Sequence, residues 1–175
     1  MNLVQRVQDI LLRPASTWPQ IEAESTDIVE LYKSYVGILA LIPAVAGFIG
    51  TSIIGMPIAW GLVTLVINYV LSLAVVYVLA LIIDVLAPNF NSTQDRLAAF
   101  KLSGYAYTAS FVAAIFSIIP RLAGLGLLLG LYSIYLIYTG LPVLMKCPED
   151  KVVIYTVVTA LCYVVMAGVL SVVAY

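Results

Sequence analysis

One carboxylate stands alone in a long apolar run of this 175-residue sequence. Asp84 lies in the segment YVLALIIDVLAP, four residues before Pro88 and seven after Tyr77, which shares its helical face. A carboxylate in such surroundings is costly unless it is paired or hydrated, so Asp84 is a candidate proton or cation ligand in a pocket. The alternative is a carboxylate at a membrane surface, paired with Arg96 or Lys101 from the connector that follows.

Tyrosine is the other abundant polar side chain, with 12 in the sequence. Tyr132, Tyr135 and Tyr138 step by three, so on a helix they cover an arc of roughly 120°. Such an arc can line a polar cleft, but phenols also lie at membrane interfaces or pack in the interior, and both interpretations stay open. If a polar cleft exists, its candidate residues are Asn68, Tyr77, Asp84, Tyr105, Tyr107, Tyr132 and Tyr135.

The segment KCPEDK at 146–151 places a thiol, two carboxylates and two amines within six residues. A thiolate beside carboxylates is not a recurrent metal spacing, and the sequence contains no histidine. We interpret the segment as a turn, in which Pro148 ends one helix while Glu149 and Asp150 favour the first turn of the next. With no Ser–His–Asp set and no phosphate loop, the sequence predicts no metal, no cofactor and no enzyme.

The composition indicates that lipid surrounds these residues. The sequence is 63% hydrophobic and 10% charged, and its mean hydropathy is +1.11, whereas a soluble domain is about 45–50% apolar and about 25% charged. The net charge of −1 and the scattered lysines and arginines argue against a nucleic-acid partner. We therefore predict an all-α integral membrane protein whose partners include membrane lipid.

Five runs are long enough to cross a hydrocarbon core, which takes about 20 helical residues. Residues 1–33 precede them as a head, and the first long apolar run should act as an uncleaved span. Ser92 and Asp95 resemble a capping box, so the third helix is expected to begin near Thr93. The predicted transmembrane domain covers 34–175, with spans at about 34–54, 60–86, 102–119, 122–145 and 152–174.

The head has its own helical pattern. Apolar residues recur at helical spacing at Leu3, Val4, Val7, Ile10 and Leu11, until Pro14 stops the pattern. This pattern predicts a short amphipathic helix in the membrane surface, and the alternative is a soluble helix packed on loops of the same protein.

Lysine and arginine divide unevenly between the two sides that the spans define. Seven lie on the side of the head, the second connector and the KCPEDK turn, and Arg121 alone lies on the other side. The positive-inside rule therefore predicts a cytoplasmic N-terminus and an external Tyr175. The predicted surface for a cytoplasmic protein partner consists of Arg6, Arg13, Trp18, Arg96 and Lys101.

Small residues form stripes along several spans. In the first span Gly37, Ala40, Ala44 and Gly47 share a face, and further stripes are Ala106, Ser110, Ala114 and Ser117, then Gly126, Gly130 and Ser133, then Ala160, Ala167 and Ser171. Such stripes let helices approach one another, either within one chain or in a homo-oligomer. Pro43 lies within the first span and predicts a kink there.

The order of several segments resembles the Yip family, the Ypt/Rab-interacting-protein family of five-span membrane proteins, and especially its small bacterial inner-membrane members. The matching segments are RPASTWPQI at 13–21, ILALIPAVAGFIGT at 38–51, KLSGYAYTAS at 101–110 and YLIYTGLPVLMKCPEDK at 135–151. The resemblance covers essentially the whole chain and implies five spans in a bacterial inner membrane. The Asp-Leu-Tyr-Gly-Pro signature of eukaryotic members is missing, and Gly104–Tyr105 alone remains of their Gly-Tyr motif. The GTPase binding that eukaryotic members would imply is therefore in question.

Two functions are consistent with these features. The first is a membrane protein that binds partners or organises membrane, with its contacts on the head and the 87–101 connector. The second is an ion or small-solute channel or transporter with a polar path around Asp84 and the tyrosines.

Overall fold

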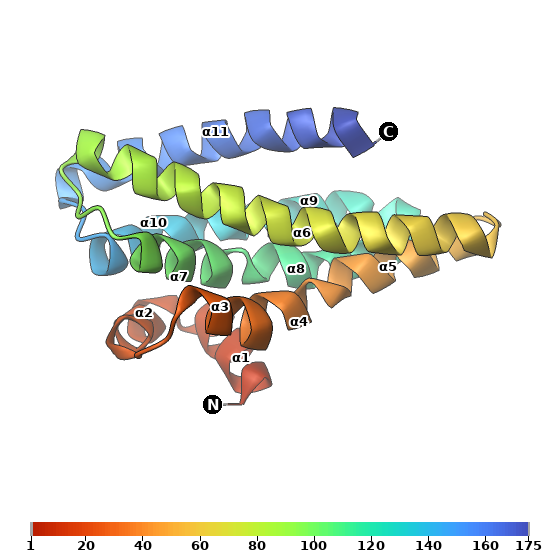
Figure 1. Cartoon of the computed structure of the whole chain (residues 1–175), viewed down its shortest axis with the longest axis horizontal. Helices are drawn as coiled ribbons and strands as arrows, with labels where there is room; N and C mark the ends of the chain where they lie inside the picture. The colour runs from red at the N-terminus through yellow and green to blue at the C-terminus, as the bar shows by residue number, and fades with distance from the viewer. Residues whose placement is uncertain (1, 175) are drawn as a thin grey trace.

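Most helices of the protein run along one long axis in the computed structural model, whereas the two N-terminal helices lie across it (Figure 1). The structure describes the backbone of residues 2–174 and the side chains within that range except those at 117, 120, 123, 127 and 166–174. Throughout this range the regular elements are helical. They are α1 (Leu3–Leu12), α2 (Pro14–Ala23), α3 (Ile28–Leu31), α4 (Gly37–Leu39), α5 (Leu41–Ile53), α6 (Ile58–Leu86), α7 (Arg96–Ala106), α8 (Thr108–Ala113), α9 (Ala123–Gly130), α10 (Tyr132–Leu144) and α11 (Glu149–Ala174).

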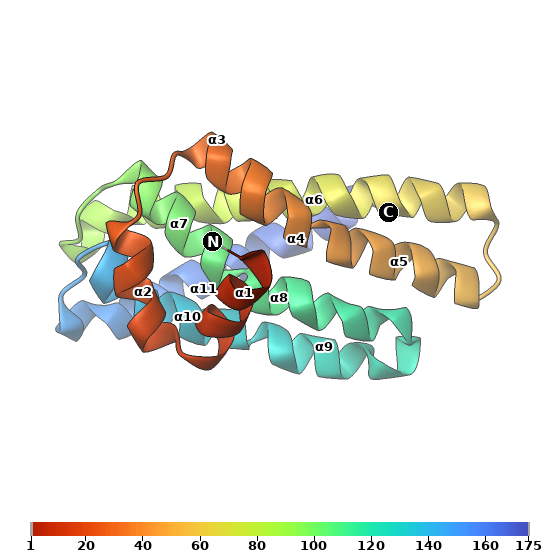
Figure 2. The same ribbon diagram turned by 90° about the horizontal axis from the view of Figure 1, so that it is seen from below.

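Short non-α turns join some of these helices. A π-helical turn, Tyr32–Val36, links α3 to α4, and 3₁₀ turns follow α6 and α8 at Ala87–Phe90, Ala114–Ile118 and Pro120–Leu122. In Figure 2, α5 and α6 form one antiparallel pair and α8 and α9 form another. Of the predicted head, residues 1–33, α1 and α2 form the part to which the word head refers from here on. We call the end with the 87–95 connector and the 145–148 turn the head end.

Three helical stretches are long and apolar enough to cross a membrane, which supports a multi-pass membrane protein. Among the described residues these are Ile28–Ile53, Ile58–Phe90 and Gly124–Leu144, and they correspond to the first, second and fourth predicted spans. The other two predicted runs are also helical, but α7 and α8 are separated at Tyr107, and α11 is not among the three. The count of five spans therefore stays a prediction.

Local sequence explains several helix ends. The predicted kink near Pro43 coincides with a break between α4 and α5 at Ala40, close to Leu39, whose carbonyl the proline cannot bond. The capping prediction at Ser92 was wrong, because α7 begins at Arg96 and the Asp95 side chain accepts from the Ala98 amide at 3.1 Å. Glu149 and Asp150 form the first turn of α11, as the KCPEDK segment predicted.

The densest part of the core lies near the head end. It combines residues from the head, α6, α7, α10 and α11 that are at most 2% exposed: Ile10, Trp18, Ile21, Leu79, Ile83, Phe100, Leu102, Leu136, Leu141 and Tyr155. Toward the opposite end the helices instead present apolar side chains outward, among them Ile53, Ile58, Trp60, Leu128 and Leu131. An apolar surface of this kind suits lipid, and it would be costly in water.

Candidate functional sites: the docked head, the head end and a cavity

Asp84 is buried near the end of α6, with 8% of its surface exposed. Its Oδ1 atom has no hydrogen-bond partner among the described residues. The nearby Tyr155 hydroxyl donates to the Ile83 carbonyl, and the Tyr155 ring stacks on Phe90 with ring centroids 4.6 Å apart. Asp84 forms neither of the ion pairs that the sequence suggested. Arg96 is exposed, and Lys101 donates hydrogen bonds to backbone carbonyls elsewhere.

The other polar residues of α6 and α7 lie in separate surroundings. Asn68 lies against Gly47 of α5, so it fills the contact between α5 and α6. Tyr77 is 47% exposed and packs edge-on against Phe100. Tyr105 lies beside Tyr35 at a ring distance of 4.5 Å and forms part of a different cluster.

The three remaining tyrosines of the predicted cleft also lie in three different surroundings. The Tyr107 and Tyr163 hydroxyls pair at 2.9 Å, whereas the Tyr132 hydroxyl donates to the Leu11 carbonyl of the head at 2.9 Å. Tyr135 is 47% exposed on the outside of α10. The structure thus distributes the predicted polar residues over several helix contacts, and the transport hypothesis gains no geometric support from them.

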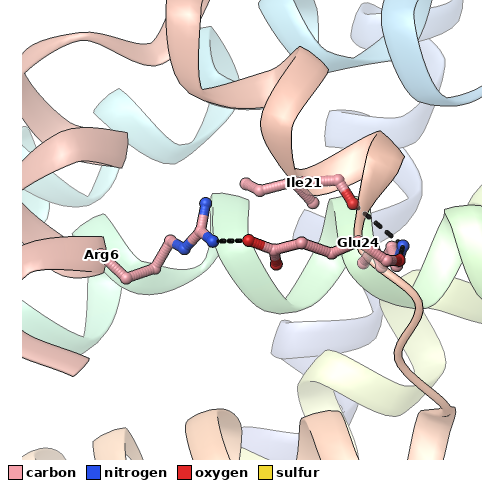
Figure 3. A network of polar contacts seen from close by, with 4 residues as sticks. Arg6, Ile21 and Glu24 are labelled. Carbon is pink, nitrogen blue, oxygen red and sulfur yellow. Dashed lines mark hydrogen bonds and ion pairs between the residues drawn. The ribbon is translucent and has the colours of Figure 1, made fainter. Parts of the chain in front are cut away.

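Two buried cations, Arg6 and Lys101, lie where the head meets the bundle, and Figure 3 shows the Arg6–Glu24 pair. The Arg6 guanidinium pairs with the Glu24 carboxylate and lies 5.6 Å from the centre of the Tyr105 ring. The Lys101 ammonium donates to the Ile21 carbonyl at 2.9 Å and to the Glu24 carbonyl at 2.6 Å. Because these carbonyls lie at the C-terminal end of α2, Lys101 both caps that helix and complements its dipole.

Trp18 attaches the other side of α2 to α10. It is fully buried, and its indole N–H donates to the Thr139 hydroxyl at 3.0 Å. The neighbouring Gly140 leaves room for it, since a Cβ there would lie 2.9 Å from Trp18 and 2.4 Å from Leu102. The one sequence signal for this contact was a glycine in an otherwise bulky helix, which is typical of close approach.

The predicted partner surface therefore needs correction. Arg6, Trp18 and Lys101 are at most 5% exposed, and each has a hydrogen-bond partner inside the protein. They are therefore not available to a protein partner. Arg13 and Arg96 are exposed, as expected of surface cations. The pattern of charges along the sequence could not distinguish a lysine that caps a distant helix from one that faces water.

Three distant segments meet at the head end. The Thr93 amide of the connector donates to the Met145 carbonyl at 2.8 Å, and Lys146 of the turn pairs with Glu22 of α2 on the surface. These contacts bring together exposed polar side chains from the three segments and from the first turns of α7 and α11. They include Glu22, Asn89, Gln94, Asp95, Arg96, Lys146, Glu149 and Asp150.

A cavity of about 380 Å³ lies farther from the head end, between α8, α9, α10 and α11. Of the residues in the predicted polar cleft, Tyr107 alone lines it. The other lining side chains are mainly apolar or small. They are Leu79, Ser110, Ala113, Ala114, Gly126, Gly130, Leu131, Ser133, Ile134, Ile137, Ala160, Tyr163 and Val164.

Comparison with known families identifies the group of proteins to which this arrangement belongs. The model of the Yip1 domain matches residues 9–172, from α1 into α11. The chain belongs to the Yip family. The end of α1, all of α2 and the bundle as far as residue 172 thus lie within one Yip domain, and the family resemblance drawn from the sequence is confirmed.

Two curated relatives of this Yip-family chain come from Escherichia coli. The chain is 26% identical over 161 residues to a protein named inner membrane protein YohC, in strain K12 and in strain O6:H1, and each match covers 85% of this chain and 83% of the relative. No solved structure matches. The relatives and the apolar helices together support a multi-pass protein of a bacterial inner membrane.

Proposed function

We propose that this Yip-family protein binds a cytoplasmic protein partner, or organises membrane through such contacts, with the head end as its contact surface. The observation that carries the proposal is the gathering of exposed charges from α2, the connector and the turn onto one end of the molecule. By contrast, the buried cations Arg6 of the head and Lys101 of the bundle serve the structure itself. Five spans with a cytoplasmic N-terminus would direct this surface to the cytoplasm.

A partner of the GTPase class has no particular support. The surviving Gly104–Tyr105 pair of the eukaryotic motif is buried in α7. A Cβ at Gly104 would lie 3.1 Å from Val36, so the glycine serves close packing of α7 on the turn before α4. The partner is therefore defined by the chemistry of the head end, which is a mixed-charge, polar surface.

The proposal can be tested by charge reversal at the head end. A photoactivatable residue in place of Gln94 should form a cross-linked product with a cytoplasmic protein in living cells. The double variant Arg96→Glu with Glu149→Lys should reduce the amount of this product about tenfold, because like charges at an interface cost more than 1.4 kcal/mol. The matched control is Arg121→Glu, an exposed arginine between α8 and α9. Gel analysis with mass spectrometry measures the product.

Two results would count against a head-end contact surface. One is the lack of any specific product at Gln94 in cells that express the protein at its natural level. The other is an equal loss of product in Arg121→Glu, which would indicate a general effect of charge rather than a contact surface.

A further inference from the structure

The cavity between α8 and α11 has the size and lining of a ligand site. Its volume of about 380 Å³ falls within the roughly 300–1,000 Å³ that is usual for small-molecule pockets, which often lie between the helices of bundles. Its floor is formed by buried residues, namely Leu79, Ala113, Ser133 and Ile137. These side chains come from three different helices, so the cavity belongs to the tertiary fold rather than to one helix.

Small residues surround this space without closing it. Gly126 of α9 does allow close approach, because a Cβ there would lie 3.0 Å from the Ala113 carbonyl oxygen. At Gly130, one turn later, the one described atom within 4 Å of an added Cβ would be the Ser110 hydroxyl oxygen at 3.8 Å. The small residues of α9, which the sequence pattern assigned to helix contacts, therefore border an unfilled volume at Gly130.

The polar groups of the lining satisfy one another. The Ser110 and Ser133 hydroxyls pair at 2.9 Å, and so do the Tyr107 and Tyr163 hydroxyls. Among the lining side chains that the structure describes, there is no Asp, Glu, Lys or Arg. An ion or a charged headgroup would be poorly solvated here, whereas an apolar occupant would regain the dispersion contacts that a void forfeits.

The cavity opens onto the surface that faces lipid. Two of its lining residues, Leu131 and Val164, are 54% and 61% exposed, and their neighbours Leu128 and Leu161 are 62% and 61% exposed. This apolar surface belongs to a chain whose surroundings are a bilayer, so the medium at the mouth of the cavity is acyl chain. An acyl chain can enter from the side without exposing apolar surface to water.

We propose that this cavity binds one acyl chain of a membrane phospholipid, held between α8, α9, α10 and α11. The inference does not rest on the proposed partner surface, because the two lie on different parts of the molecule and share no residue. A bound chain would complete the packing among these four helices.

The test uses the full-length protein in phosphatidylethanolamine–phosphatidylglycerol vesicles that contain a phospholipid with a photoactivatable diazirine in its acyl chain. Labelling should concentrate on α9 and α10, and Gly130→Leu should reduce it about tenfold because the new side chain occupies the cavity. Gly124→Leu is the matched control, since it lies on the same helix, is exposed and has nothing within 4 Å of an added Cβ. Peptide mass spectrometry locates the label.

A second filling variant and a competition experiment keep the test decisive. Ala160→Leu fills the cavity from α11 and should act like Gly130→Leu. In the wild-type protein, excess unlabelled oleic acid should compete with the label at the cavity and leave labelling of the outer face of α5 unchanged. Uniform labelling without competition would overturn the proposal, and so would a cavity filled by a second copy, seen as a dimer that Gly130→Leu dissociates.

Discussion

The Lys101 ammonium is buried in the interior, where it donates hydrogen bonds to two carbonyl groups at the end of α2. Hydrogen bonds to a charged group are worth about 1.5–3 kcal/mol each, so this residue is a main attachment of the head. We expect Lys101→Met to release the head, because methionine fills the space but leaves the α2 carbonyls without a donor. Limited proteolysis should then cleave the Glu24–Asp27 segment about tenfold faster.

A surface lysine provides the control for this prediction. Lys33→Met removes an exposed charge of the same type and should leave the cleavage rate unchanged. If Lys101→Met also left it unchanged, the buried ammonium would not be what holds α2 in place.

Individual residues show where sequence reasoning fails. Charge and spacing placed Arg6, Trp18 and Lys101 on the surface, because a sequence does not reveal a partner 121 residues away, such as Thr139 for Trp18. The prediction for Glu149 and Asp150 was confirmed, because a helix start depends on the residues beside it.

Among the contacts between helices, that of α2 with α10 depends on Gly140, a residue without a side chain. A Cβ at Gly140 would lie 2.4 Å from Leu102 and 2.9 Å from Trp18. Gly140→Ala should therefore destabilise the protein by about 1–3 kcal/mol through overpacking, despite the better helix propensity of alanine. Thermal unfolding in detergent, followed by Trp fluorescence, measures the loss.

The same substitution elsewhere isolates packing from propensity. Gly124→Ala adds a methyl group where nothing lies within 4 Å, so it should be neutral or slightly stabilising. Equal thermal unfolding midpoints for Gly140→Ala and Gly124→Ala would show that α2 shifts readily to accommodate the methyl group at residue 140.

Continuous apolar runs made the long helices predictable from sequence. The predicted run at 60–86 corresponds to α6, Ile58–Leu86. Its limits were predictable because the GMP segment precedes it and the polar connector follows it. The break between α7 and α8 at Tyr107 was not predictable, since neither proline nor glycine marks it. The docking of the head on α8 and α10 was equally hidden, because it depends on tertiary contacts and not on local pattern.

For the whole molecule, the predicted orientation across the membrane rests on the uneven distribution of lysine and arginine. In a background with Cys147→Ala and Cys162→Ala, a membrane-impermeant maleimide should label Met56→Cys on intact spheroplasts but label Asn89→Cys only after lysis. Both sites are exposed, and they lie in connectors at opposite ends of α6. The reverse labelling pattern would invert the predicted topology and direct the head end away from the cytoplasm.

The length of α6 has a consequence for the membrane itself. Its 29 residues span about 43 Å, and Asp84, its one Asp, Glu, Lys or Arg, lies two residues from its end. The apolar part, about 39 Å, exceeds a hydrocarbon core of about 30 Å, which is a positive hydrophobic mismatch. Tilting alone would require about 40°, the upper end of the range for spanning helices. The lipids beside α6 should therefore stretch, so that the protein favours the thicker regions of its membrane.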